Sequence, residues 1–186
     1  MNRAAVQKLT ASALLIALGM LIPMFSPVKI LLEPASFTLA SHVAIFVAMV
    51  ISPGVAALVT AGTTLGFFLS GVFPLVVTLR AASHIVFSLP GAFYLRRGYA
   101  SAGALRLRVF SFLIGILHGL AEVAVVGAFY FGGSMGEAYY QNGFLFTVIG
   151  LVGIGTVVHS MVDFEIARLL LRPLEKQPGF RAMAGR

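Results

Sequence analysis

The sequence predicts an all-α integral membrane protein, a six-transmembrane-helix bundle with both termini in the cytoplasm. Hydrophobic residues make up 59% of its 186 residues and charged residues 10%, against roughly 45–50% and 25% in soluble proteins. Such a chain has too little polar surface to cover a core in water. Its apolar runs are long and do not alternate with polar residues, which favours membrane helices over a β-barrel.

Six apolar segments predict the helices of a single membrane domain, residues 1–186. Proline, glycine or charged residues separate the segments, and these residues end membrane helices. The first segment follows a basic start, as in a signal peptide, but no convincing cleavage site follows it, so we interpret it as a retained helix. The predicted helices cover residues 9–25, 37–51, 54–70, 74–95, 106–131 and 142–171.

The basic residues predict the orientation. Of the 13 Lys and Arg residues, all but Lys29 and Arg80 lie near the N-terminus, between the fourth and fifth helices, or after the middle of the sixth. These places share one side of a six-helix bundle, and the positive-inside rule assigns that side to the cytoplasm. The rule explains the net charge of +7 without nucleic-acid binding. We therefore expect a multi-pass protein of the cytoplasmic membrane.

Three predicted helices carry ionisable residues in pairs spaced i,i+4, which places both members on one helix face. Each such residue costs roughly 2.5–3.5 kcal/mol within the membrane, so each is a candidate for function. The pairs are Arg80 with His84, His118 with Glu122, and His159 with Asp163. The rise per residue places the first two pairs at similar depths, near His42, and the third far closer to the cytoplasm. The first two pairs predict a binding cavity; alternatively, Arg80 and Glu122 only lock two helices together.

Other chemistries are less favoured by the sequence. No metal site is expected, because His-Glu-x-x-His is absent and the third pair is predicted to lie too deep to join the others. An intramembrane hydrolase would need a serine beside a histidine, and the adjacent Ser83 and His84 point in different directions. A stand-alone proton-coupled carrier could use Glu122 with His118 as a relay. The chain has no G-x-x-x-x-G-K-[ST] motif for nucleotides, and neither enzyme activity nor a cofactor is expected.

Two further segments are candidates for contacts. Ala13 and Ala17 form a small-x-x-x-small pair, which lets another helix approach closely, either a partner's or one of the chain's own. Between Pro27 and Pro34, the apolar residues 30–32 lie in a segment predicted to be outside the membrane. They either cover a binding cavity or dip into the lipid interface.

These residues together resemble the substrate-binding (S) component of an energy-coupling factor vitamin transporter, of the group assigned to small heteroaromatic B vitamins. The resemblance covers nearly the whole chain. It includes Ala13-x-x-x-Ala17 on the first helix, the segment from Glu33 to His42 (EPASFTLASH), and the run from Gly62 to Phe68 (GTTLGFF).

The resemblance implies a protein that captures a water-soluble vitamin from outside the cell. A transmembrane coupling subunit would dock at Ala13 and Ala17, and two cytoplasmic ATPase subunits would supply the energy. The expected vitamin is pyridoxine or a hydroxymethylpyrimidine first, then niacin, whose carboxylate Arg80 could clamp. The implied lid residues are Lys29, Leu31 and Glu33. The implied vitamin-binding residues are Arg80, His84, His118, Glu122, His42, Tyr139, Tyr140 and Asn142.

Overall fold

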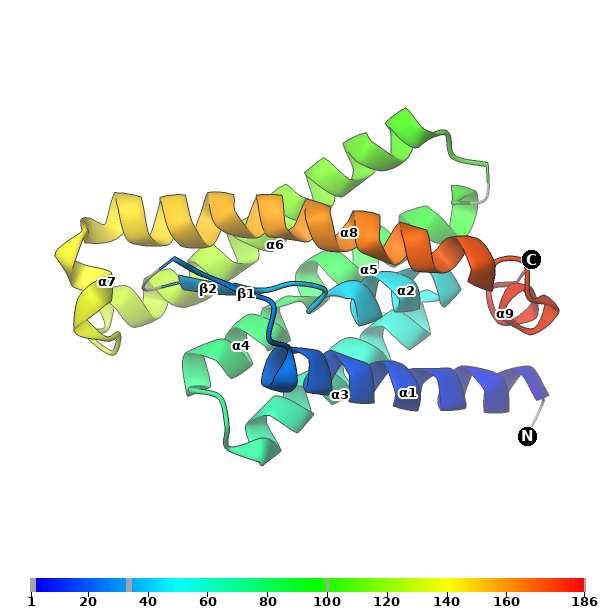
Figure 1. Cartoon of the computed structure of the whole chain (residues 1–186), viewed down its shortest axis with the longest axis horizontal. Coiled ribbons are helices and arrows are strands. Elements are labelled where there is room, and N and C mark those ends of the chain that lie inside the picture. The colour runs from blue at the N-terminus through cyan, green and yellow to red at the C-terminus, as the bar shows by residue number, and fades with distance from the viewer. Residues whose placement is uncertain (1–2, 33–34, 100, 186) are drawn as a thin grey trace.

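The computed structural model describes residues 3–32, 35–99 and 101–185, and it confirms the helical class (Figure 1). The described chain is helical apart from one two-stranded hairpin. Its elements are α1 (Arg3–Phe25), β1 (Lys29–Leu32), β2 (Ala35–Thr38), α2 (Val43–Ile51), α3 (Pro53–Ser70), α4 (Leu75–Ser83), α5 (Ile85–Gly98), α6 (Ala104–Phe131), α7 (Glu137–Gln141), the π-helix η1 (Leu145–Ile154), α8 (Gly155–Leu174) and α9 (Pro178–Met183).

Five helical stretches of the described chain are long and apolar enough to cross a membrane. Their outward side chains include many exposed leucines and phenylalanines, which suit contact with lipid rather than with water. The protein is therefore a multi-pass membrane protein. The five stretches are Ala4–Phe25, Pro53–Ser70, Leu75–Arg96, Ala104–Phe131 and Leu145–Leu174.

The predicted helix over residues 37–51 is wrong in its first part. Phe37 and Thr38 belong to strand β2, which pairs antiparallel with β1. Helix α2 has only nine residues, all buried, and a helix of that length is too short to span the roughly 30 Å hydrocarbon core. The preceding turn is held by Asp163 on α8, a contact 123 residues away from Ala40 that no local pattern reveals.

The predicted helix over residues 74–95 is two helices, α4 and α5, which meet at His84 within one candidate span. The His84 N–H donates to the Ala81 carbonyl, so this bond spans three residues instead of four and tightens the turn. The other four predicted helices differ from the observed ones only at their ends. The last of them begins as the π-helix η1, a rare element that sequence periodicity does not distinguish.

Local sequence signals set both ends of α3. The Ser52 side chain accepts a hydrogen bond from the Val55 N–H, and Pro53 occupies the first helical turn, where its missing N–H costs nothing. At the other end Gly71 adopts φ 64°, the left-handed conformation that commonly stops a helix and that glycine adopts without strain. The observed bounds therefore match the predicted ones to within one residue.

Glycines on α6 let it pack closely against η1 and α8. A Cβ atom added at Gly119 would lie 2.8 Å from the Gly153 carbonyl oxygen, and one at Gly115 would lie 3.2 Å from that of Val157. Only a residue without a side chain allows two helix backbones to approach this far. The close packing brings Glu122, one turn further along α6, within reach of Thr156 on α8.

Short helix α2 forms the centre of the core, with α1, α3, α5, α6 and α8 around it. Phe46 and Met49 on α2 are almost fully buried and pack with Phe87 of α5 and Phe164 of α8. Helix α9 contacts α1, so the N- and C-terminal ends of the chain lie at one end of the molecule (Figure 1). The C-terminal end of α5 and the N-terminal end of α6 lie at the same end.

Candidate functional site

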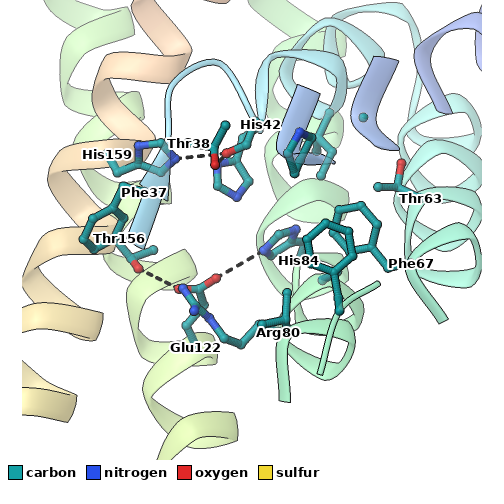
Figure 2. A pocket seen from close by; sticks show the side chains of 17 residues that line it. Phe37, Thr38, His42, Thr63, Phe67, Arg80, His84, Glu122, Thr156 and His159 are labelled. Carbon is teal, nitrogen blue, oxygen red and sulfur yellow. Dashed lines mark hydrogen bonds and ion pairs between the residues drawn. The ribbon is translucent and has the colours of Figure 1, made fainter. Parts of the chain in front are cut away.

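A cavity of about 190 Å³ lies between the hairpin, the turn before α2, and helices α1, α3, α4, α6 and α8 (Figure 2). Sites for drug-sized ligands are larger, roughly 300–1,000 Å³, so this one suits a molecule with a single ring. Its wall combines aromatic, hydroxyl and ionisable side chains. The lining residues with such groups are Phe37, Phe67, Phe73, Thr38, Ser41, Thr63, Thr156, His42, Arg80, His84, Glu122 and His159.

The buried Glu122 and the partly buried Arg80 form an ion pair in this wall. Arg80 Nη2 donates to Glu122 Oε2 at 2.7 Å, and the Thr156 hydroxyl donates to the same oxygen at 2.6 Å. Within the described chain, Arg80 Nε is buried and has no hydrogen-bond partner. The guanidinium thus holds Glu122 through Nη2 and lines the cavity as a fixed cation.

Three imidazole rings lie against one another beside Glu122. The rings of His42, His84 and His118 have centroids 4.7–4.8 Å apart, each pair edge to face. His84 Nε2 lies 3.3 Å from Glu122 Oε1, and His118 Nε2 lies 3.5 Å from the same oxygen. The predicted grouping of Arg80, His84, His118 and Glu122 with His42 is therefore present in the structure, although His42 precedes α2 and does not lie within it.

Asp163 on α8 holds the turn that presents His42. Its carboxylate accepts from the backbone N–H groups of Ala40 at 2.7 Å and His42 at 2.9 Å, and lies 3.0 Å from His42 Nδ1. Ala40 has φ 68°, a conformation that costs an L-residue about 1–2 kcal/mol. The carboxylate thus keeps a strained turn in place, and the turn directs His42 into the cavity wall.

The prediction that His159 and Asp163 lie far below the other pairs is wrong. His159 lines the cavity, and its ring centroid is 5.1 Å from that of His42 (Figure 2). The error has a physical cause: Thr156 on α8 donates to Glu122 on α6, and His159 follows Thr156 by less than one helical turn, so these residues lie at similar depth. Depth therefore does not exclude a metal site.

The Ser41 hydroxyl lies 3.0 Å from His159 Nε2, but the arrangement is not that of a catalytic triad. Asp163 Oδ2 lies 3.3 Å from the same Nε2 atom. A triad needs the carboxylate on the opposite ring nitrogen, where it orients the histidine as a base. The hydroxyl of Ser83, which the sequence places beside His84, donates instead to the Arg80 carbonyl at 2.7 Å.

The three residues of the loop before the last helix that were predicted to contact the vitamin do not line the cavity. Tyr139 is part-buried beside Val126 and Val148; burial raises its pKa, and the nearby charge of Arg80 opposes that shift. The Tyr140 hydroxyl donates to the Tyr130 carbonyl at 3.1 Å and so closes the loop on itself. Asn142 is exposed at the end of α7. Contact of these three residues with a ligand stays a prediction.

The predicted lid segment forms the β1–β2 hairpin. Lys29 and Leu31 lie in β1, while Glu33 lies outside the described residues. The neighbouring strand β2 contributes Phe37 and Thr38 to the cavity wall. A Cβ atom added at Gly155 would lie 2.6 Å from the Phe37 ring, so this glycine on α8 makes the space in which the ring packs.

The aromatic and hydroxyl residues of the wall were not predicted from the sequence. Phe67 and Phe73 pack with ring centroids 4.3 Å apart on one side of the cavity. The buried Thr63 hydroxyl has no hydrogen-bond partner in the described chain. Such residues are common in membrane helices, so only the GTTLGFF run, which contains Thr63 and Phe67, gave a signal at all.

The alanine pair of α1 lies on the surface. Ala13 and Ala17 are exposed, together with Leu14 and Leu18. Only 11% of the most apolar stretch of α1 is buried, against 44% for α6. Packing within the chain therefore does not explain this pair, and the face is available to lipid or to another protein.

Comparison with known proteins identifies the family. The chain is 42% identical over 176 residues to the niacin transporter NiaX of Lactococcus lactis subsp. cremoris, an alignment that covers 94% of this chain and 78% of that protein. The chain belongs to the substrate-binding (S) components of energy-coupling factor transporters. This confirms the family that the sequence resembled. No protein-family model matches the chain, and no solved structure matches it.

Membership in the S-component family makes the cavity of the membrane domain the candidate binding site. A cavity lined by several elements of the membrane domain holds the ion pair and three of the imidazoles in its wall. The family also makes transport, not catalysis, the activity to be explained.

Proposed function

We propose that this protein is the niacin-binding subunit of an ATP-driven importer. Niacin exists at neutral pH as nicotinate, a single aromatic ring with one carboxylate. The observation that carries the proposal is Arg80, whose guanidinium lies in the wall of a small aromatic cavity. Niacin thereby moves ahead of pyridoxine and hydroxymethylpyrimidine, because neither of those has a carboxylate for this guanidinium. The relative that transports niacin supports the same choice.

The remaining polar and aromatic groups suit the ring. Phe37, Phe67 and Phe73 can pack against a flat heteroaromatic, and the unpartnered Thr63 hydroxyl can donate to a ring nitrogen. The β1–β2 hairpin would act as the lid, since β2 already supplies part of the wall. Closure of such a segment over a bound molecule excludes water and retains the vitamin.

The partners would be a transmembrane coupling subunit and two cytoplasmic ATPases. Ala13 and Ala17 form the docking face on α1, since they are small, exposed and flanked by exposed leucines. Both ends of the chain and the α5–α6 connection lie at one end of the molecule (Figure 1). The basic residues of these segments would place that end in the cytoplasm.

The vitamin is tested by binding of nicotinate, nicotinamide and pyridoxine to the purified protein. Nicotinate should bind tightest, because nicotinamide lacks the charge and pyridoxine lacks the carboxylate. The double variant Arg80→Gln/Glu122→Gln removes the buried pair without leaving a lone charge. It should lower nicotinate affinity about 10–100-fold, since hydrogen bonds to charged groups contribute about 1.5–3 kcal/mol.

The matched control is Arg168→Gln/Glu165→Gln, which removes an arginine–glutamate pair on α8 that lies away from the cavity. It should leave nicotinate affinity unchanged. Tighter binding of pyridoxine than of nicotinate by the wild-type protein would overturn the niacin assignment and leave the family intact. Unchanged nicotinate affinity in Arg80→Gln/Glu122→Gln would show that the ion pair only joins helices.

Docking is tested separately by Ala17→Trp. This change should abolish vitamin uptake by cells while nicotinate affinity of the purified protein stays the same, because the side chain points away from the cavity. Uptake at the wild-type rate would refute the docking face. Loss of nicotinate binding together with uptake would show that Ala17 supports the fold instead.

A further inference from the structure

All four histidines of the chain converge on one cavity. His42, His84 and His159 line it, and His118 lies directly behind its wall, with its ring 4.7 Å from those of His42 and His84. A ligand with one ring can use only one or two imidazoles as hydrogen-bond partners. Recognition of such a vitamin therefore does not explain the cluster.

The two oxygens of Glu122 have different surroundings. Oε2 is occupied by Arg80 and Thr156, while Oε1 is hydrogen-bonded to His84 Nε2 at 3.3 Å and faces His118 Nε2 at 3.5 Å without a hydrogen bond. Ligand atoms about 2.0–2.1 Å from a tetrahedral ion are roughly 3.4 Å apart. The two observed separations match that spacing.

His118 provides independent evidence for a ligand-binding position. It is fully buried, and neither of its ring nitrogens has a hydrogen-bond partner within the described chain. The 3.5 Å approach to Glu122 is close enough for an electrostatic contact but does not form a hydrogen bond. Buried polar atoms without partners are rare because each costs about 1–3 kcal/mol. A metal ion at Nε2 would remove this cost for that atom.

The Asp163 carboxylate fixes the tautomer of His42. A carboxylate that already accepts two backbone N–H groups is an acceptor only, so the 3.0 Å contact places the hydrogen on His42 Nδ1. The lone pair of Nε2 is then free for a ligand. Histidines that bind metal commonly donate their other ring N–H to a carboxylate in this way.

We propose that His42, His84, His118 and Glu122 bind one divalent first-row transition ion, with Zn²⁺ as the reference. Each side chain offers one ligand atom, and the four atoms lie within 4.8 Å of one another. Three imidazole nitrogens and one carboxylate oxygen suit such an ion, whereas Mg²⁺ and Ca²⁺ prefer oxygen ligands. The longest separations shorten when the side chains close on the ion.

The ion also has a consequence for the vitamin, which rests on the proposed function. In or directly behind the described part of the wall, Arg80 is the one fixed cation, and Glu122 and Asp163 are anions. With neutral imidazoles, the wall and the Asp163 carboxylate behind it together carry one net negative charge, which opposes entry of nicotinate. A divalent ion reverses the sign of this charge, so nicotinate should bind more tightly in its presence.

The metal site is tested with Co²⁺ alone, before any vitamin is added. The protein is purified without a polyhistidine tag, treated with a chelator and titrated with Co²⁺. One ion per chain, with the intense visible absorption of tetrahedral Co²⁺ and displacement by Zn²⁺, is the expected result. Thermal unfolding should shift upward with Zn²⁺, because the ion binds the folded state.

The variants separate the site from ordinary surface binding. His118→Gln and Glu122→Gln should each lose the tetrahedral Co²⁺ signal, while Glu165→Gln, the same change at an exposed carboxylate, should keep it. Circular dichroism verifies that each variant is folded. Should either cavity variant fail to fold, X-ray absorption of the Co²⁺-loaded wild-type protein decides: a shell of nitrogen with one carboxylate supports the site, and a shell of oxygen alone refutes it.

Nicotinate binding is then measured with and without the ion. Binding that is at least tenfold tighter with Zn²⁺ supports the coupling. Binding that ignores Zn²⁺ but strengthens as pH falls would refute it and assign the positive charge to protonated imidazoles. Stoichiometric Co²⁺ binding without any nicotinate binding would keep the metal site and overturn the niacin function instead. Failure of wild-type protein to retain Co²⁺ would overturn the site, whatever the vitamin.

Discussion

Glu122 on α6 and Asp163 on α8 are buried carboxylates that each follow a histidine by four residues, yet the fold gives them different partners. Glu122 is held by side chains of two other helices, Arg80 and Thr156. Asp163 is held by backbone N–H groups of the turn before α2. One local pattern therefore serves two purposes, and the difference arises from what faces each carboxylate.

The comparison shows which carboxylate belongs to recognition. Glu122 is part of the cavity wall and is paired with a cation that can be shared with a ligand. Asp163 is absent from the wall, and its charge is satisfied by N–H groups that cannot leave without unfolding the turn. Variants of Glu122 should thus change both ligand affinity and stability, and variants of Asp163 mainly stability.

The largest effect is expected from Glu122→Ala. It leaves Arg80 as an uncompensated buried charge, and breaking a buried pair in this way costs about 3–5 kcal/mol. Thermal and denaturant unfolding in detergent should show this loss, and added nicotinate should restore part of it by supplying a carboxylate to Arg80. A melting temperature close to wild type would show that Arg80 finds another partner and that the pair contributes little to stability.

Asp163→Asn should have the next largest effect. The amide is nearly the same size, but it loses the charge that strengthens the bonds from Ala40 and His42, a difference of about 1 kcal/mol for each bond. Hydrogen exchange at these two backbone amides should become faster, while nicotinate affinity falls less than in variants of Arg80. An equal loss of nicotinate affinity in the Asp163 and Arg80 variants would show that Asp163 takes part in recognition as Glu122 does.

Ala40→Gly should act in the opposite direction and more weakly. Glycine adopts the observed φ of 68° without strain, which should stabilise the protein by about 0.5–1 kcal/mol after the loss of chain entropy is allowed for. The measurement is the melting temperature, alone and combined with Asp163→Asn. If Asp163 holds the strained turn, the gain from glycine should be smaller in the Asp163→Asn background, where Ala40 can relax, than in the wild-type protein.

The smallest effect is expected from Glu165→Gln on the same helix as Asp163. Glu165 pairs with Arg168 at 2.7 Å, but half of its side chain is exposed, and exposed pairs contribute about 0–1 kcal/mol. Its unfolding transition and nicotinate affinity should match those of the wild-type protein. A loss as large as that of Asp163→Asn would mean that charge on α8, rather than the turn contact, stabilises this region.

Composition and short local signals determined much of this protein. The excess of apolar residues predicted a helical membrane protein, because a helix satisfies its own backbone in lipid. Ser52, Pro53 and Gly71 predicted the ends of α3, because caps act within a few residues of themselves. The i,i+4 spacing selected three ionisable pairs, because helical geometry alone places their members on one face.

Only the tertiary structure decided how those pairs meet. The turn at Ala40 depends on a carboxylate 123 residues away, so no local pattern could show that α2 is short or that His42 lies beside His159. The closeness of Glu122 to Thr156 depends on glycines that let α6 approach α8. Helical spacing fixes which side chains share a face, whereas the distance between faces follows from packing along the whole chain.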